Sequence, residues 1–128
     1  MTFKAAAIQM CSGIDPQRNA AAMARLVREA AASGATYVQT PEMTGMLQRD
    51  RAAGKLHLRD EANDIIVRTA RELAGELQIY VHVGSTAIAL EDGKLANRGY
   101  LFGPDGEILN RYDKIHMFDV DLDNGESW

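Results

Sequence analysis

Short apolar runs alternate with amphipathic helical stretches in the first part of this sequence, and strands separated by turns follow. We expect helices over 16–32 and 60–77, and strands over 3–10, 35–39, 78–89, 95–102 and 107–112. A β-α-β-α order followed by a β-meander is typical of layered α/β folds, whose early strands pair in parallel and late strands antiparallel. The sequence therefore predicts one α/β domain with a mixed sheet and no internal linker.

Turn and capping residues support these boundaries. Asp15 can cap a helix whose first residue is Pro16, and Gly34 is free to adopt the left-handed conformation that ends it. Residues 91–94 and 103–106 contain Asp-Gly, which tolerates the positive φ of tight turns. Residues 44–58 fit either a loop or an irregular helix.

Composition narrows the class of protein. The 128 residues are 46% hydrophobic and 25% charged, which is typical of one globular domain rather than a disordered chain. A net charge of -4 without a basic stripe disfavours nucleic acid as a partner. No apolar run reaches membrane-spanning length, and we see no signal peptide. The single cysteine, Cys11, fits a reducing compartment, so we expect a cytoplasmic location without membrane association.

Glu42 and Lys114 stand where two predicted strands run out into loops. Catalytic groups of α/β enzymes commonly occupy such positions, because the rigid strand fixes the loop that follows it. Glu42 can equally be a solvated loop carboxylate, and Lys114 a surface lysine that balances Asp113. The apolar Ile115 beside Lys114 favours a packed segment, in which the ammonium group is suited to hold a developing oxyanion.

Cys11 and the histidines offer weaker chemistry. We interpret Cys11 as a small buried hydrophobe at a strand end, although it can also be read as a nucleophile with His82 or His116 as its base. His57, His82 and His116 lie too far apart in the sequence for a helical metal site, and His82 fits a structural role.

An acidic run near the end of the chain resembles a calcium loop only superficially. Asp119, Asp121 and Asp123 alternate with apolar residues, and Gly125 falls one place late. The chain ends before a twelfth-position glutamate. We therefore expect no metal site.

Three stretches together resemble the nitrilase superfamily of carbon–nitrogen hydrolases: residues 5–10, residues 39–45, and residues 97–106 running into 111–121. The run Lys-Ile-His-Met-Phe-Asp-Val-Asp from Lys114 is most similar to the branch that includes deaminated-glutathione amidase and ω-amidase. The resemblance covers the whole chain. It implies an α-β-β-α sandwich, of which residues 1–128 form the amino-terminal half, with helices on one face of a mixed sheet.

The resemblance also implies a chemistry. Family members hydrolyse nonpeptide amides or nitriles without a cofactor, through a cysteine thioester. By position, Glu42 takes the role of general base and Lys114 that of oxyanion stabiliser. The family's nucleophilic cysteine lies well after the lysine, so Cys11 does not match it, and Glu126 is out of register with a second supporting glutamate. We expect a small-molecule amide substrate, a homo-oligomer, and no activity from the isolated chain. The alternative is a non-catalytic half-fold that acts as an interaction module.

Overall fold

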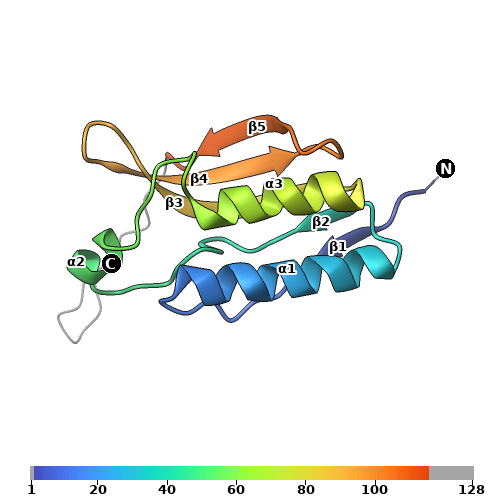
Figure 1. The fold of residues 1–128 in the computed structure, drawn as a ribbon, viewed down its shortest axis with the longest axis horizontal. Coiled ribbons are helices and arrows are strands. Elements are labelled where there is room, and N and C mark those ends of the chain that lie inside the picture. Colours follow the sequence, from blue (N-terminus) through green and yellow to red (C-terminus); the bar gives the residue numbers. More distant parts are fainter. Residues whose placement is uncertain (1, 116–128) are drawn as a thin grey trace.

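A computed structural model describes residues 2–115 of the chain as one mixed sheet with helices on one side. The sheet is five-stranded, with strands in the order β1-β2-β3-β4-β5. The strands are β1 (Ala5–Ala7), β2 (Tyr37–Gln39), β3 (Tyr80–Ala89), β4 (Leu95–Phe102) and β5 (Ile108–Asp113); the helices are α1 (Pro16–Ala32), α2 (Arg51–Lys55) and α3 (Ile65–Leu77) (Figure 1).

Strand pairing changes character across the sheet. β1 pairs with β2, and β2 with β3, in parallel, while β3–β4 and β4–β5 are antiparallel. The two helices α1 and α3 supply the crossovers that parallel pairing needs, and turns supply the antiparallel connections. The predicted α/β fold with a mixed sheet is confirmed.

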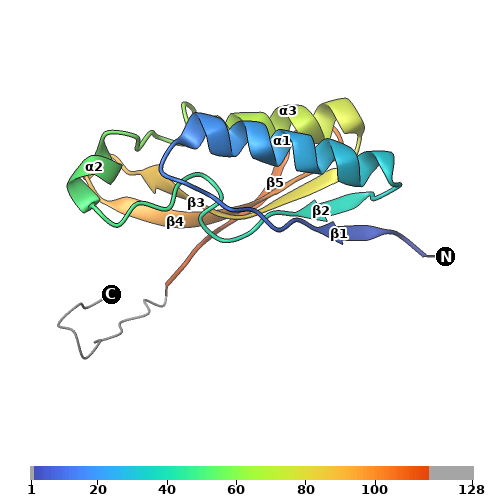
Figure 2. The same cartoon turned by 90° about the horizontal axis from the view of Figure 1, so that it is seen from below.

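α1 and α3 lie side by side against the same face of the sheet (Figure 2). α1 begins at Pro16 as predicted, because the Asp15 side chain accepts hydrogen bonds from the backbone N–H groups of Gln17 and Arg18. The core between helices and sheet is formed by apolar side chains that include Met23, Val27, Ile66, Leu73, Val81, Val83, Tyr100 and Phe102. Helices therefore cover one face, as expected.

α3 begins later than the sequence indicated. It starts at Ile65 rather than at residue 60, because the Asp64 side chain caps it by accepting from the Val67 N–H. Asp60 instead organises the preceding turn, since its side chain accepts hydrogen bonds from Asn63. Two aspartates four residues apart can each cap a helix, and the sequence alone does not choose between them.

β1 is shorter and more exposed than predicted. It covers Ala5–Ala7 instead of the predicted 3–10, and it is not the buried strand that an apolar run of this kind indicates. β1 lies at the edge of the sheet, where Ala6 and Ile8 pack against the core while Ala5 and Ala7 face outward. An edge strand covered on one side buries only alternate residues.

The remaining boundaries shift for local reasons. β3 begins at Tyr80, because Gln78 ends α3 in a left-handed conformation with φ of 53°. Within 44–58, the short helix α2 forms behind Asp50, whose side chain caps it. Within residues 2–115, no helix is both long and apolar enough to cross a membrane.

The sheet face opposite the helices is open. No described helix or strand covers it (Figure 2). We call it the open face; at its centre, Tyr37, His82 and Leu101 border a hollow of about 430 Å³. This face meets the candidate site at the ends of β2 and β5.

Candidate active site

The loop that carries Glu42 is hydrogen-bonded to β3 before and after the glutamate. As the chain leaves β2, the Thr40 N–H donates to the His82 carbonyl at 2.9 Å, and the Gly84 N–H donates back to the Thr40 carbonyl at 3.2 Å. Beyond Glu42, the Thr44 N–H donates to the Ser85 carbonyl at 2.9 Å. Backbone bonds before and after Glu42 thus fix where its side chain starts.

Two features of this loop need special residues. A Cβ atom at Gly84 would lie 2.5 Å from the Thr40 carbonyl oxygen, so only glycine allows the loop to cross β3 so closely. Met43 has φ of 51°, a left-handed conformation that is uncommon for methionine, and its N–H donates to Ser85 Oγ at 2.9 Å. The loop is therefore tightly specified around Glu42.

Lys114 follows directly on β5 and remains attached to β4. Its backbone N–H donates to the Asn97 carbonyl at 2.9 Å, which extends the antiparallel ladder by one bond beyond Asp113. Arg98 of β4 donates to both carboxylate oxygens of Asp113, at 2.6 and 3.0 Å. This bidentate pair fixes the strand end from which the lysine side chain departs.

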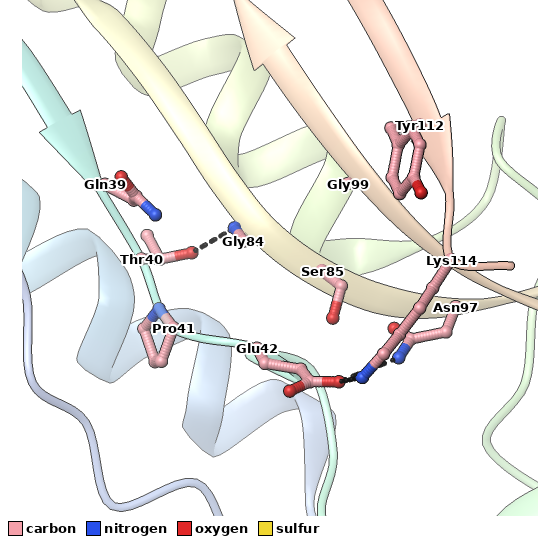
Figure 3. A pocket seen from close by; sticks show the side chains of 10 residues that line it. All are labelled: Gln39, Thr40, Pro41, Glu42, Gly84, Ser85, Asn97, Gly99, Tyr112 and Lys114. Atoms are coloured by element: carbon pink, nitrogen blue, oxygen red, sulfur yellow. Dashed lines mark hydrogen bonds and ion pairs between the residues drawn. The ribbon is translucent and has the colours of Figure 1, made fainter. Parts of the chain in front are cut away.

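Glu42 and Lys114 meet although they are 72 residues apart in the sequence. Lys114 Nζ donates a short hydrogen bond to Glu42 Oε1, and Asn97 Nδ2 donates to the same oxygen at 3.2 Å (Figure 3). The hydrogen bond from Lys114 lowers the pKa of Glu42 below its usual value, against the opposing effect of partial burial. The glutamate is therefore a carboxylate at neutral pH, beside an ammonium group.

The pair lies in a cleft of about 480 Å³ at the carboxyl end of β2. Its walls come from four parts of the fold: the segment 39–42, β3 at Gly84 and Ser85, β4 at Asn97 and Gly99, and the end of β5 at Tyr112 and Lys114 (Figure 3). The cleft combines a proton acceptor, a cation beside it and open space for a small molecule. That combination suits general base catalysis and the stabilisation of an oxyanion.

Comparison with known families decides the membership of the chain. Residues 4–128 match the model of the family described as Carbon-nitrogen hydrolase. This chain belongs to the carbon–nitrogen hydrolase family.

Relatives of the chain include proteins named as amidases. The chain is 38% identical over 125 residues to Omega-amidase NIT2 of Mus musculus, covering 94% of this chain and 43% of that protein. It is 31% identical over 119 residues to Deaminated glutathione amidase of Yersinia enterocolitica, covering 91% of this chain and 41% of that protein. The chain thus spans less than half the length of these relatives.

Solved structures with the same fold include the C. elegans NitFhit protein and an amidase from Nesterenkonia sp. The TM-score is 0.77 for both, with 20% and 21% sequence identity. The match covers 91% of this chain in each case, and 28% and 44% of those chains respectively. These likenesses confirm the predicted fold class.

Cys11 does not line the cleft. It is exposed in the segment after β1, so its interpretation as a buried hydrophobe is wrong. The reason is the early end of β1, which leaves Cys11 beyond the sheet. Cys11 is not among the residues that line the cleft, and the reading of it as a nucleophile gains no support from the geometry.

The histidines are placed apart from the pair. His82 Nδ1 hydrogen-bonds Tyr37 Oη at 2.5 Å on the open face, and burial lowers its pKa, which agrees with the structural role expected of it. His57 is exposed just after α2. His116, the aspartates at 119, 121 and 123, and Glu126 lie outside the described residues. Between residues 2 and 115, no group of three or more acidic, histidine or cysteine side chains is arranged to hold a metal ion.

Two residues at or near the cleft, Asn97 and Glu61, could not be singled out from the sequence. The sequence pointed to Asn97 only as part of a longer motif. Because side chains alternate between the faces of a strand, the position of Asn97 between Ala96 and Arg98 could have placed its side chain on the open face. Glu61 accepts hydrogen bonds from Arg98, Tyr100 and Arg111, and the bond from Arg111 is the main reason that its pKa falls to about 2. No local signal links Glu61 to residues so distant in sequence.

Proposed function

We propose that this carbon–nitrogen hydrolase chain supplies the general base, Glu42, and the oxyanion stabiliser, Lys114, of a site that hydrolyses a nonpeptide amide. The observation that carries the proposal is the contact of the two side chains in one cleft, brought there by separate elements. The names of its relatives support an ω-amide of a small carboxylic acid, such as deaminated glutathione, as the substrate.

In the proposed reaction, the nucleophile is a cysteine that lies beyond these 128 residues in a longer, intact protein. Glu42 accepts the thiol proton as sulfur attacks the amide carbon, and Lys114 stabilises the negative charge that develops on the carbonyl oxygen. The tetrahedral intermediate then collapses. Its C–N bond breaks, and the proton on Glu42 passes to the leaving amine or ammonia.

Hydrolysis of the thioester completes the cycle. Glu42 takes a proton from water as the water oxygen attacks the thioester carbon. Lys114 again stabilises the oxyanion. The C–S bond breaks, the carboxylic acid leaves, and the thiolate regains the proton from Glu42.

Activity assays on the intact protein test these roles. We expect Glu42→Gln to lower kcat by at least about 100-fold, because proton transfer loses its acceptor. Lys114→Met should lower kcat by about 100-fold through loss of oxyanion stabilisation. Glu91→Gln and Lys94→Met, in the exposed β3–β4 turn, are matched controls that should retain activity. Near-normal turnover by Glu42→Gln would contradict the proposal.

The 128-residue chain provides a second test. We expect no ammonia release from an ω-amide substrate by this chain alone, since Cys11 lies outside the cleft. Turnover by the isolated chain that survives Cys11→Ala would show that no further cysteine is needed.

The open face favours a second candidate function, that of an interaction module without catalysis. An uncovered sheet face with exposed aromatic side chains such as Tyr80 and Tyr112 is suited to bind another protein surface. Under this alternative, the purified chain is a stable oligomer with cooperative unfolding, as analytical ultracentrifugation and urea titration would reveal. A homo-oligomer and a cytoplasmic location are also our proposals for the intact protein.

A further inference from the structure

We propose that Asn97 is a positioning residue for Glu42, which holds one carboxylate oxygen beside Lys114 and leaves the other free to accept a proton. This inference rests on the proposed role of Glu42. It concerns a side chain in the middle of the sheet rather than either of the charged residues.

The hydrogen bonds to Glu42 are unevenly distributed. Lys114 Nζ and Asn97 Nδ2 both donate to Oε1. No residue in the described range 2–115 donates to Oε2, and this second oxygen points away from both donors (Figure 3). A carboxylate oxygen that accepts two hydrogen bonds is the less basic of the pair, so a proton goes preferentially to Oε2.

Lys114 alone is a poor means of fixing the carboxylate. Its ammonium group sits on a flexible four-carbon stem, and the side chains of Lys114 and Glu42 are 43% and 58% exposed. An ammonium group of this kind can pair equally well with either carboxylate oxygen of Glu42. Asn97 has a short side chain on β4, whose backbone pairs with Ala87 of β3 on one side and accepts from Lys114 on the other. The amide of Asn97 therefore supplies the fixed direction that the lysine lacks.

The orientation of the Asn97 amide follows from Glu42. A carboxylate is only an acceptor, so the NH₂ group must face it. Asn97 Oδ1 is then left buried, without a hydrogen-bond partner among the described residues. A buried acceptor without a partner is rare in proteins because it destabilises the fold. Its presence here is accounted for if the NH₂ group is needed at Glu42.

Titration of Glu42 tests the proposal without an activity assay. The carboxyl carbon of Glu42 would be followed by NMR against pH in the 128-residue chain and in Asn97→Leu, which removes the donor at similar size. We expect the pKa of Glu42 to rise in Asn97→Leu, because a hydrogen bond to the ionised form is lost. Asn110→Leu, the same replacement at an exposed position of β5, is the matched control and should leave the titration unchanged. An equal response in the two variants would overturn the proposal.

Kinetics of the intact protein provide the second readout. We expect Asn97→Leu to lower kcat by about 10-fold with little change in KM, the size expected for a lost hydrogen bond to a charged group. The acid limb of its pH profile should move to higher pH, because Glu42 must be ionised to act as base. A raised KM with unchanged kcat would instead make Asn97 a substrate contact and overturn the positioning role.

The two proposals fail in different ways. If the intact wild-type protein hydrolyses no amide, the proposed function is wrong, while the titration of Glu42 still decides the role of Asn97.

If circular dichroism shows that Asn97→Leu does not fold, Asn97→Asp replaces it, since aspartate keeps the size and polarity of the side chain. Asn97→Asp should raise the pKa of Glu42, because a carboxylate takes the place of a donor, and an unchanged titration would overturn the proposal.

Discussion

Glu42 and Lys114 meet in one cleft, but the fold holds them by different means. Glu42 lies in a loop whose backbone is hydrogen-bonded to the interior strand β3 on either side, at Thr40 and Thr44. Lys114 starts from β5, an edge strand whose residues are mostly exposed and whose side chains form ion pairs with β4 and Glu61.

The two sides of the cleft should therefore respond to different conditions. Backbone hydrogen bonds and close packing do not depend on ionisation. The Glu42 loop should therefore respond mainly to substitutions that change the size of a packed side chain. Ion pairs that are partly exposed weaken with salt and with protonation. The end of β5 that carries Lys114 should therefore loosen before the Glu42 loop when salt is added or the pH is lowered.

The largest effect is expected from a change of shape at Gly84. A Cβ atom there would lie 2.5 Å from the Thr40 carbonyl oxygen, which is backbone and cannot move aside cheaply. We expect Gly84→Ala to lower the free energy of unfolding by about 3 kcal/mol, the upper range for overpacking. Urea unfolding followed by circular dichroism measures it.

Gly13→Ala is the matched control for this change. No atom lies within 4 Å of a Cβ atom placed at Gly13, so its effect should stay below about 0.5 kcal/mol. If Gly84→Ala proved equally mild, the Glu42 loop would be more adaptable than its close backbone contact with β3 indicates.

An intermediate effect is expected from the ion pairs that hold β5. Arg98→Met removes the bidentate bonds to Asp113 and the contact with Glu61, and should cost about 1.5 kcal/mol, as for lost hydrogen bonds to charged groups. Arg25→Met breaks an exposed pair with Glu29 on α1, and should cost less than about 0.5 kcal/mol.

Hydrogen exchange shows where Arg98→Met acts. The Lys114 amide, which bonds the Asn97 carbonyl, should exchange faster in this variant, while the Thr44 amide in the Glu42 loop should not. Equal acceleration at both amides would mean that the two sides of the cleft open together.

The smallest effect is expected from acid. The pKa of Glu61 is lowered to about 2, mainly by its hydrogen bond from Arg111, and the pKa of Asp113 is lowered by Arg98. A carboxylate with a depressed pKa in the folded state stabilises the fold above its unfolded pKa, and this stability is lost as pH falls through the folded value. Burial raises the pKa of Asp64, so the contribution of Asp64 to the pH dependence of stability has the opposite sign.

We therefore expect stability to fall between about pH 4.5 and pH 2, by about 1 kcal/mol for the partly exposed Glu61. Glu61→Gln should flatten this part of the curve of unfolding free energy against pH. Glu72→Gln, an exposed glutamate on α3, is the control and should leave the curve unchanged. A Glu61→Gln curve that matches the wild-type curve would contradict a role for Glu61 in holding β5.

Much of the architecture followed from local pattern. The element order predicted the mixed sheet, and Asp15 with Pro16 predicted the start of α1, because helix capping depends on neighbours in the chain. The start of α3 and the length of β1 were wrong, because competing caps and edge position are decided by what packs nearby.

Sequence pattern alone was enough to predict the fold class and to single out Glu42 and Lys114 as candidate catalytic side chains. The tertiary structure was needed to show that Lys114 and Asn97 donate to the same carboxylate oxygen of Glu42, and that Cys11 does not line the cleft. The physical reason is distance along the chain. Periodicity and capping act over a few residues, whereas the contact of β4, β5 and the loop after β2 depends on the register of the whole sheet.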